Sequence, residues 1–173
     1  MQHTALIYTM VIMSAADSEM TDREIFIIGD IVKTLPAFEN FDPELLPEIA
    51  ANCAEILGQE NGVETVINIV ADSLPANLRA TAYALACDVA VADGEVKQEE
   101  LRLLEMIRHR IDVDRLHAAA IETGAKARYQ KIDWRPNNRL ALAAITALQQ
   151  SRRRRRYLLP SSVVRSGLRI CGV

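Results

Sequence analysis

The feature of this sequence that most constrains its fold is a pattern that occurs twice, 76 residues apart. Residues 16–24 read Ala-Asp-Ser-Glu-Met-Thr-Asp-Arg-Glu, and residues 92–100 read Ala-Asp-Gly-Glu-Val-Lys-Gln-Glu-Glu. In both copies an apolar stretch ends at an Asp-x-Glu turn, and an amphipathic stretch opens with a glutamate seven residues after the aspartate. Such a pattern is typical of a duplicated helix-turn-helix unit. The sequence therefore predicts a pseudo-twofold internal repeat, with units at about residues 4–35 and 76–111.

The rest of the chain also favours helices. It holds only seven Gly and six Pro in 173 residues, and strands would need β-branched runs with turn residues at close spacing. We therefore expect an all-α fold, a seven- to eight-helix bundle, in which the stretches 4–16 and 76–92, apolar nearly all round, lie at the centre. Helical periodicity between prolines and turn residues places the helices near residues 4–16, 22–35, 43–57, 62–74, 76–92, 98–110, 113–127 and 136–150.

Three local signals refine this prediction. Asp42 before Pro43 is an N-cap with proline at the first helical position. Thr21 with Glu24 three residues later matches a capping box. Asp88 is surrounded by apolar neighbours, and a buried carboxylate without a partner is costly, so we expect it at a polar edge or paired with an arginine.

The charge is divided unevenly along the chain. Residues 1–151 hold 13 basic and 23 acidic side chains, a net charge of −10, whereas residues 152–173 hold seven Arg and no acid, a net charge of +7. We therefore expect a helical domain over residues 1–151 and an extended or poorly packed basic tail over 152–173. A membrane surface is a possible partner for Arg152–Arg156. The alternative is a tail that is solvated or docked on its own domain, and nucleic acid is not the expected partner.

The cysteines and the lack of catalytic motifs reduce the number of possible functions. Cys53, Cys87 and Cys171 are far apart and odd in number, which supports neither a disulfide framework nor a metal knuckle and favours a cytoplasmic location. The sequence has no Gly-rich phosphate loop, no G-x-S-x-G turn and no cysteine near a histidine. We therefore do not expect an enzyme.

The carboxylates of the repeated turns suggest a metal site. Asp-x-Glu in a turn can direct both carboxylates to one side, and the glutamate in the first turn of the next helix lies within reach. Hard oxygen ligands of this kind suit Ca²⁺ or Mg²⁺. The predicted ligands are Asp17, Glu19 and Glu24 in the first copy and Asp93, Glu95 and Glu100 in the second.

A structural interpretation of the same residues stands beside the metal site. Glu24 would be a capping partner, Asp17 and Gly94 turn residues, and Glu19 and Glu95 solvated charges. In the second copy Lys97 occupies the cap position and its side chain cannot accept a backbone hydrogen bond, so capping does not fully explain Glu100. An EF-hand is excluded, because the twelfth position from each aspartate is Ile28 or Leu104.

The two segments, Ala-Asp-Ser-Glu-Met and Ala-Asp-Gly-Glu-Val, each followed by a glutamate that opens an amphipathic helix, resemble the tellurite-resistance TerB family. Relatives of that family include the N-terminal domain of a DnaJ-type co-chaperone. The resemblance covers about residues 4–150 and is strongest over 83–107. It implies an all-helical, pseudo-twofold bundle that binds divalent metal through acidic turn residues and works in stress response, including tellurite tolerance. Ser18 departs from the glycine usual in this turn.

The sequence thus leads to two hypotheses. In the first, a non-enzymatic cytoplasmic domain binds a divalent cation at two acidic interhelical turns and acts in a tellurite or metal stress response. In the second, the chain is a protein-interaction or co-chaperone-type adaptor whose acidic turns are only structural caps. Both hypotheses include a protein partner.

Overall fold

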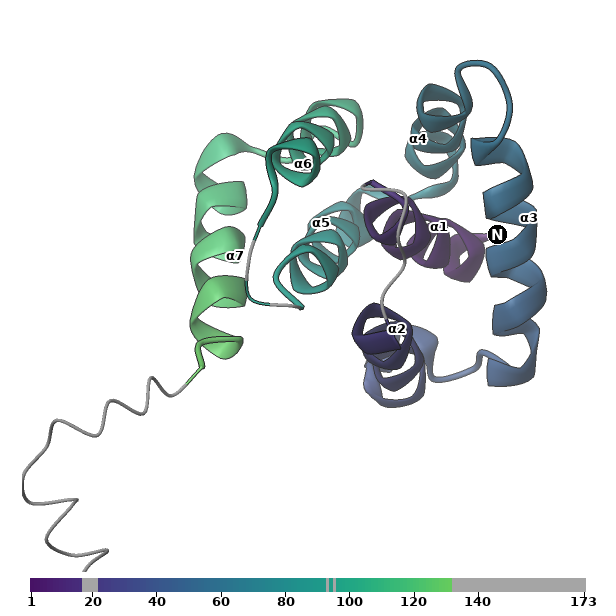
Figure 1. The fold of residues 1–173 in the computed structure, drawn as a ribbon, viewed down its shortest axis with the longest axis horizontal. Helices are drawn as coiled ribbons and strands as arrows, with labels where there is room; N and C mark the ends of the chain where they lie inside the picture. The colour runs from purple at the N-terminus through teal and green to yellow at the C-terminus, as the bar shows by residue number, and fades with distance from the viewer. Residues whose placement is uncertain (17–21, 93, 95, 132–173) are drawn as a thin grey trace, which may run out of the picture. The chain divides into compact units, whose positions relative to one another are not determined.

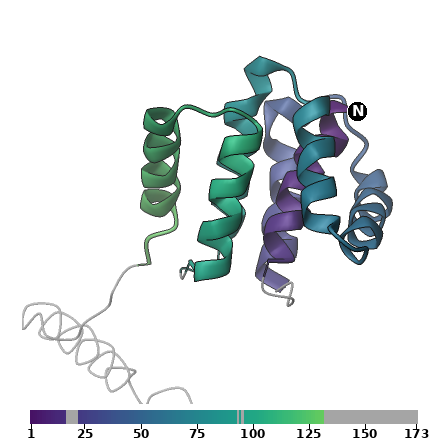
Figure 2. The same cartoon turned by 90° about the horizontal axis from the view of Figure 1, so that it is seen from above.

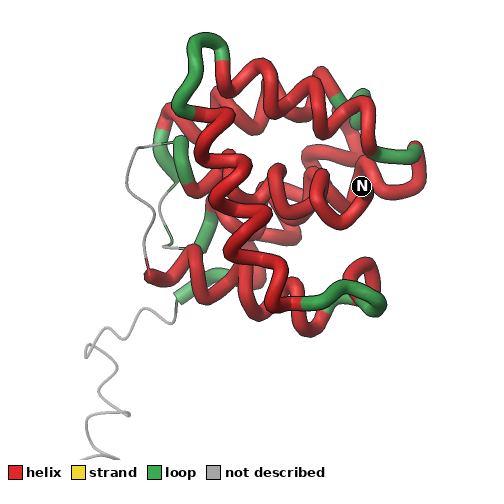
Figure 3. The backbone as a smooth tube through the Cα atoms, turned by 90° about the vertical axis from the view of Figure 1, so that its right-hand side faces the viewer, coloured by secondary structure: helices red, strands yellow, loops and turns green. Residues whose placement is uncertain are grey.

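A computed structural model describes residues 1–16, 22–92, 94 and 96–131, without the side chains of 22–24. Within this part of the chain every regular element is a helix (Figures 1 and 3), which confirms the all-α fold class. The elements are α1 (Gln2–Ser14), α2 (Asp22–Thr34), the short 3-10 helices η1 (Pro36–Phe38) and η2 (Pro43–Leu45), α3 (Leu46–Leu57), α4 (Gly62–Ser73), α5 (Ala76–Ala90), α6 (Gln98–Arg110) and α7 (Arg115–Arg128). Residues Met1–Lys131 form one compact unit. The expected helix 136–150, the boundary at residue 151 and the basic tail lie outside the described residues.

The core is built around α1. Every residue from Ala5 to Ser14 is buried, and α1 packs against α3, α4 and α5 (Figure 1). Two of its buried polar side chains bond within the helix: Thr9 Oγ1 donates to Ala5 O at 2.8 Å and Ser14 Oγ donates to Met10 O at 3.2 Å. In the described part of the chain no helix is long and apolar enough to cross a membrane.

The expected helix 43–57 is divided in two. Asp42 is an N-cap as expected, since its Oδ1 accepts from Glu44 N at 3.0 Å, but the element that it caps is η2. Pro47 has no N–H with which to continue an α-helical ladder to the carbonyl of Pro43, and Leu46 N donates to that carbonyl instead. The chain therefore passes through a 3-10 turn before α3 begins.

The lone acid of α5 has the partner that we expected. Asp88 is paired with Arg128 of α7, and the Asp88 side chain is 17% exposed. The ion pair lies at the edge of the α5–α7 contact and removes the cost of an unpaired carboxylate near the core.

The two copies of the repeat share their helix boundaries. α1 ends at Ser14 and α5 at Ala90, while α2 and α6 begin at Asp22 and Gln98, so both pairs of bounds are 76 residues apart. The helix ends also share two backbone hydrogen bonds: Ala15 N donates to Val11 O and Ala16 N to Met13 O, as Val91 N does to Cys87 O and Ala92 N to Val89 O. A twofold superposition of the two units stays a prediction.

Replacing either of two glycines by alanine tests the packing, and the two replacements should change stability in opposite directions. A Cβ at Gly62 would lie 2.3 Å from Ile56 O and 2.6 Å from Leu57 O, so Gly62→Ala should lower the free energy of unfolding by about 2–4 kcal/mol. A Cβ at Gly29, inside α2, would meet no atom within 4 Å, so Gly29→Ala should raise it by about 0.5–1 kcal/mol. Urea unfolding of both variants measures the two shifts. Equal effects would contradict the close approach of α4 to the end of α3.

The buried thiols predict a loss of stability at alkaline pH. Burial raises the pKa of Cys53 and of Cys87 from 9.0 to about 12, and Glu122 and Asp88 add to the shift at Cys87. Between about pH 9 and 12 the unfolded chain loses these protons and the folded chain keeps them, so stability should fall by about 1.4 kcal/mol per pH unit for each thiol. Below pH 9 this contribution is fully present.

Urea unfolding at pH 7.5, 9 and 10 measures this dependence. Cys87→Ala should remove the share of Cys87 and leave a shallower pH dependence than that of the wild type. The same slope in both proteins would show that the Cys87 thiol does not keep its proton in the folded state.

Candidate functional site

The second acidic turn connects α5 to α6. Its backbone begins with the bond from Gly94 N to Val91 O at 3.0 Å, and Gly94 has φ +93°, a conformation that side chains with a Cβ rarely adopt. The glycine thus lets the chain reverse directly after α5. Asp93 and Glu95, which flank it, lie outside the described residues.

Glu100 is held at the start of α6. Its side chain is buried, 7% exposed, and Oε2 accepts a hydrogen bond from Lys97 N at 2.7 Å. This is the glutamate half of a capping box, which needs only the backbone N–H of the cap residue. The sequence argument that capping does not fully explain Glu100 because of Lys97 therefore loses its basis, since the side chain of the cap residue does not enter this bond. Capping by one oxygen does not test whether the carboxylate also binds a cation.

A lysine distant in sequence lies against this turn. A Cβ placed on Gly94 would lie 2.9 Å from Lys131 Nζ and 3.1 Å from Lys131 Cε. The ammonium group that follows α7 therefore lies against the backbone between Asp93 and Glu95. Sequence reasoning missed this residue, because Lys131 is 37 positions from Gly94 and no local pattern connects them.

The first acidic turn begins at the same end of the bundle. Asp17 and Glu19 lie outside the described residues, as does the side chain of Glu24. The residues that enter this turn, Ala15 and Ala16, line a shallow pocket of about 290 Å³ together with Glu99 and Arg102 of α6. Figure 2 shows the end of α1 and the start of α6 at the same edge. The start of the first turn thus lies close to the end of the second.

The metal-site prediction itself is not tested by these positions. Among the side chains that the structure describes, no three His, Cys, Asp or Glu gather as a metal-binding group, and this set contains only Glu100 of the six predicted ligands. The described neighbours are a capped helix start, a glycine turn and a lysine.

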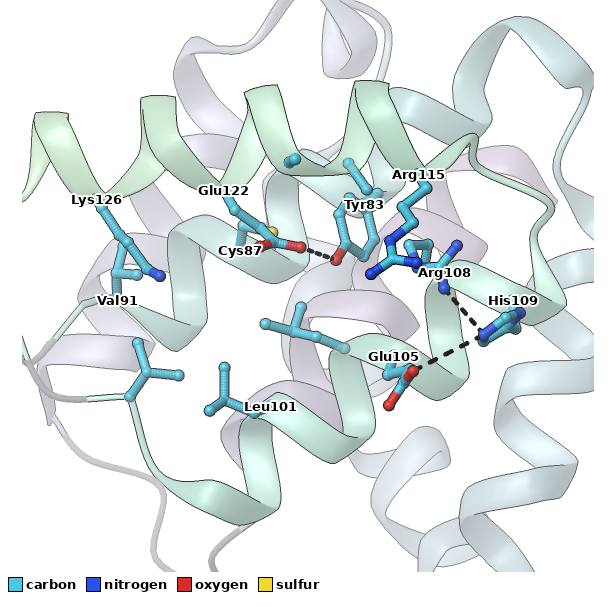
Figure 4. A pocket seen from close by; sticks show the side chains of 14 residues that line it. Tyr83, Cys87, Val91, Leu101, Glu105, Arg108, His109, Arg115, Glu122 and Lys126 are labelled. Atoms are coloured by element: carbon cyan, nitrogen blue, oxygen red, sulfur yellow. Dashed lines mark hydrogen bonds and ion pairs between the residues drawn. The ribbon is translucent and has the colours of Figure 1, made fainter.

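A second feature is a groove between α6 and α7. Both helices pack on α5 and make little contact with each other, so a space of about 680 Å³ is left between them (Figure 4). Only residues 111–114 connect α6 to α7, and the two buried side chains among them, Ile111 and Val113, do not line this space. We call this space the α6–α7 groove; it is lined by the apolar and cysteine residues Val91, Val96, Leu101, Leu104, Ala118, Ala119 and Cys87, and by the polar residues Tyr83, Glu105, Arg108, His109, Arg115, Glu122 and Lys126.

One hydrogen bond spans the α5 side of the groove. Tyr83 is 1% exposed, and its hydroxyl donates to Glu122 Oε1 of α7 at 2.7 Å. Burial, followed by this bond to a carboxylate, raises the pKa of Tyr83 well above its ordinary value. Tyr83 therefore stays a neutral donor, and Glu122 has a fixed neighbour. No motif in the sequence marked this pair.

Comparison with known families relates these features to other proteins. The family described as tellurite resistance protein TerB matches residues 3–125, which is more than half of the chain. The match runs from α1 into α7, so it includes both acidic turns and nearly all of the groove. No curated protein and no solved structure matches the chain.

Proposed function

Because this chain belongs to the tellurite-resistance TerB family, we propose that it binds a divalent cation at its acidic turns and acts in tellurite or metal stress response. The proposed ligands are Asp17, Glu19, Glu24, Asp93, Glu95 and Glu100, and the proposed cation is of the Ca²⁺ or Mg²⁺ type. In this proposal the protein is not an enzyme, acts in the cytoplasm and binds a protein partner.

The observation that carries this proposal is the position of Glu100. The carboxylate is fixed by Lys97 N at the start of α6, directly after the turn that holds Asp93 and Glu95. The side chain is already ordered and largely shielded from water, so cation binding would not be opposed by the loss of its rotamer entropy. The donor set consists of carboxylate oxygens, which fits a hard cation.

The chain's own residues set the electrostatics of the turn. Carboxylates brought together repel one another, and the Lys131 ammonium against Gly94 offsets part of that repulsion. A bound divalent cation would supply more positive charge at shorter range, and would connect the end of α5 to the start of α6. Cation binding would therefore couple to the packing of α6 on α5.

The capping bond of Glu100 also favours the second hypothesis, a protein-interaction or co-chaperone-type adaptor with structural turns. Two large apolar side chains on α2 are exposed in the described unit, Ile25 by 52% and Phe26 by 72%. They offer an apolar surface to a partner. The adaptor hypothesis predicts no saturable response to Ca²⁺ or Mg²⁺.

Titration with Ca²⁺ and Mg²⁺ separates the hypotheses. Under the metal hypothesis the wild type should give saturable heat in calorimetry, and its unfolding free energy should rise by about 2.7 kcal/mol at a cation concentration 100 times the Kd. Glu100→Gln keeps an acceptor for Lys97 N and removes the charge, so its Kd should be at least about tenfold higher. Glu48→Gln is the matched control, because Glu48 is at the same position in the first turn of α3. No saturable heat in the wild type would leave the adaptor hypothesis.

A variant of Lys131 should change the cation affinity in the opposite direction to Glu100→Gln. Lys131→Gln removes a cation from the turn, so the Kd for the divalent ion should fall, whereas Lys33→Gln in the last turn of α2 should leave it unchanged. Growth on tellurite of cells that express wild type or Glu100→Gln then tests the stress role, since only the wild type should restore tolerance. Equal growth of the two strains would show that tellurite tolerance does not require cation binding by Glu100.

A further inference from the structure

The α6–α7 groove has an end where positive charge gathers. Arg108 of α6 and Arg115 of α7 both line it, and Figure 4 shows them at the same end with His109. Arg108 Nη2 lies 2.9 Å from His109 Nε2, and arginine is always a donor, so the imidazole nitrogen accepts this bond. Within the described residues neither arginine makes an ion pair with a carboxylate.

This arrangement is favourable for an anion. Two guanidinium groups that face one space repel each other, and an anion between them converts the repulsion into attraction. The planar fork of arginine suits a carboxylate, because two parallel N–H···O bonds can form to each group. The nearest acid on α6, Glu105, has an oxygen 3.9 Å from His109 Nε2 and is not paired with either arginine.

The remainder of the groove is suited to an apolar chain. From the arginines the lining continues over Leu104 and Leu101 toward Val96 and Val91, and Leu101 is 44% exposed despite its size. The volume of about 680 Å³ lies within the range of small-molecule sites. Lys126 lies at the opposite end from the arginines (Figure 4). A charged head and an apolar tail therefore match the two parts of the groove.

We propose that the α6–α7 groove binds a small amphipathic carboxylate, with its head between Arg108 and Arg115 and its apolar tail along Leu104 and Leu101. The ligand class is a free medium-chain carboxylic acid in its ionised form. Tyr83 and Glu122 lie next to the arginines (Figure 4), and because Glu122 already accepts the tyrosine hydroxyl, its charge is partly compensated there. This proposal does not depend on cation binding at the acidic turns.

Calorimetry on the full chain tests it, with sodium decanoate below its micelle concentration as the probe. We expect saturable binding of one decanoate per chain, weakened by salt because the head contact is ionic. Decyltrimethylammonium, with the same tail and the opposite charge, should bind at least about tenfold more weakly. Similar heats from both probes would show non-specific adsorption to apolar surface and overturn the proposal.

Variants then locate the site. Arg115→Gln should raise the Kd for decanoate at least about tenfold, whereas Arg102→Gln, which removes the same charge from α6 outside the groove, should change it less than twofold. Ala119→Phe fills the groove from the exposed side of α7 and should abolish binding. Thermal unfolding confirms that each variant is folded. Equal affinities of Arg115→Gln and Arg102→Gln, or no saturable binding to the wild type, would overturn the proposal.

Discussion

The described part of this protein depends on the burial of one helix, α1. A helix that is apolar on all sides cannot stay in water, and ten consecutive residues of α1 are removed from solvent by α3, α4 and α5. The backbone polar groups are satisfied within the helix, and the hydroxyls of Thr9 and Ser14 donate hydrogen bonds to carbonyl groups of the same helix. The other helices can then remain amphipathic, with one face against this centre.

The position of α1 and α5 side by side also determines where the acidic turns begin. Each central helix ends with the same two backbone hydrogen bonds and is followed by seven residues before the next helix. These turns carry carboxylates at a point where the N-terminus of the next helix offers partial positive charge. Lys131 adds a full positive charge at the second turn. The helix N-terminus and Lys131 thus offset part of the negative charge of this turn, and any divalent ion must compete with them.

The groove on the other side of α6 has a different origin. The connection between α6 and α7 is only four residues long, and its buried side chains, Ile111 and Val113, do not line the groove. Tyr83 and Cys87 of α5 therefore line an open space, and Tyr83 reaches α7 through its hydrogen bond to Glu122. Both side chains are buried, and this burial is the main cause of their raised pKa values. The arginines lie at the mouth, where their charge keeps contact with water.

The sequence by itself determined the described helices to within about two residues, apart from the division of 43–57 into η2 and α3, because period and capping act over a few residues. It placed α2 and α6 within one residue of their bounds, predicted the Asp42 cap, and indicated that Asp88 needs a partner. It also selected six carboxylates as ligands, but not how they are arranged. Only the tertiary structure decided that Arg128 pairs with Asp88, that Lys131 reaches Gly94, and that Arg108 and Arg115 share a groove. These contacts join residues 40, 37 and seven positions apart on different elements, and their geometry follows from how helices pack on α5, which no local pattern encodes.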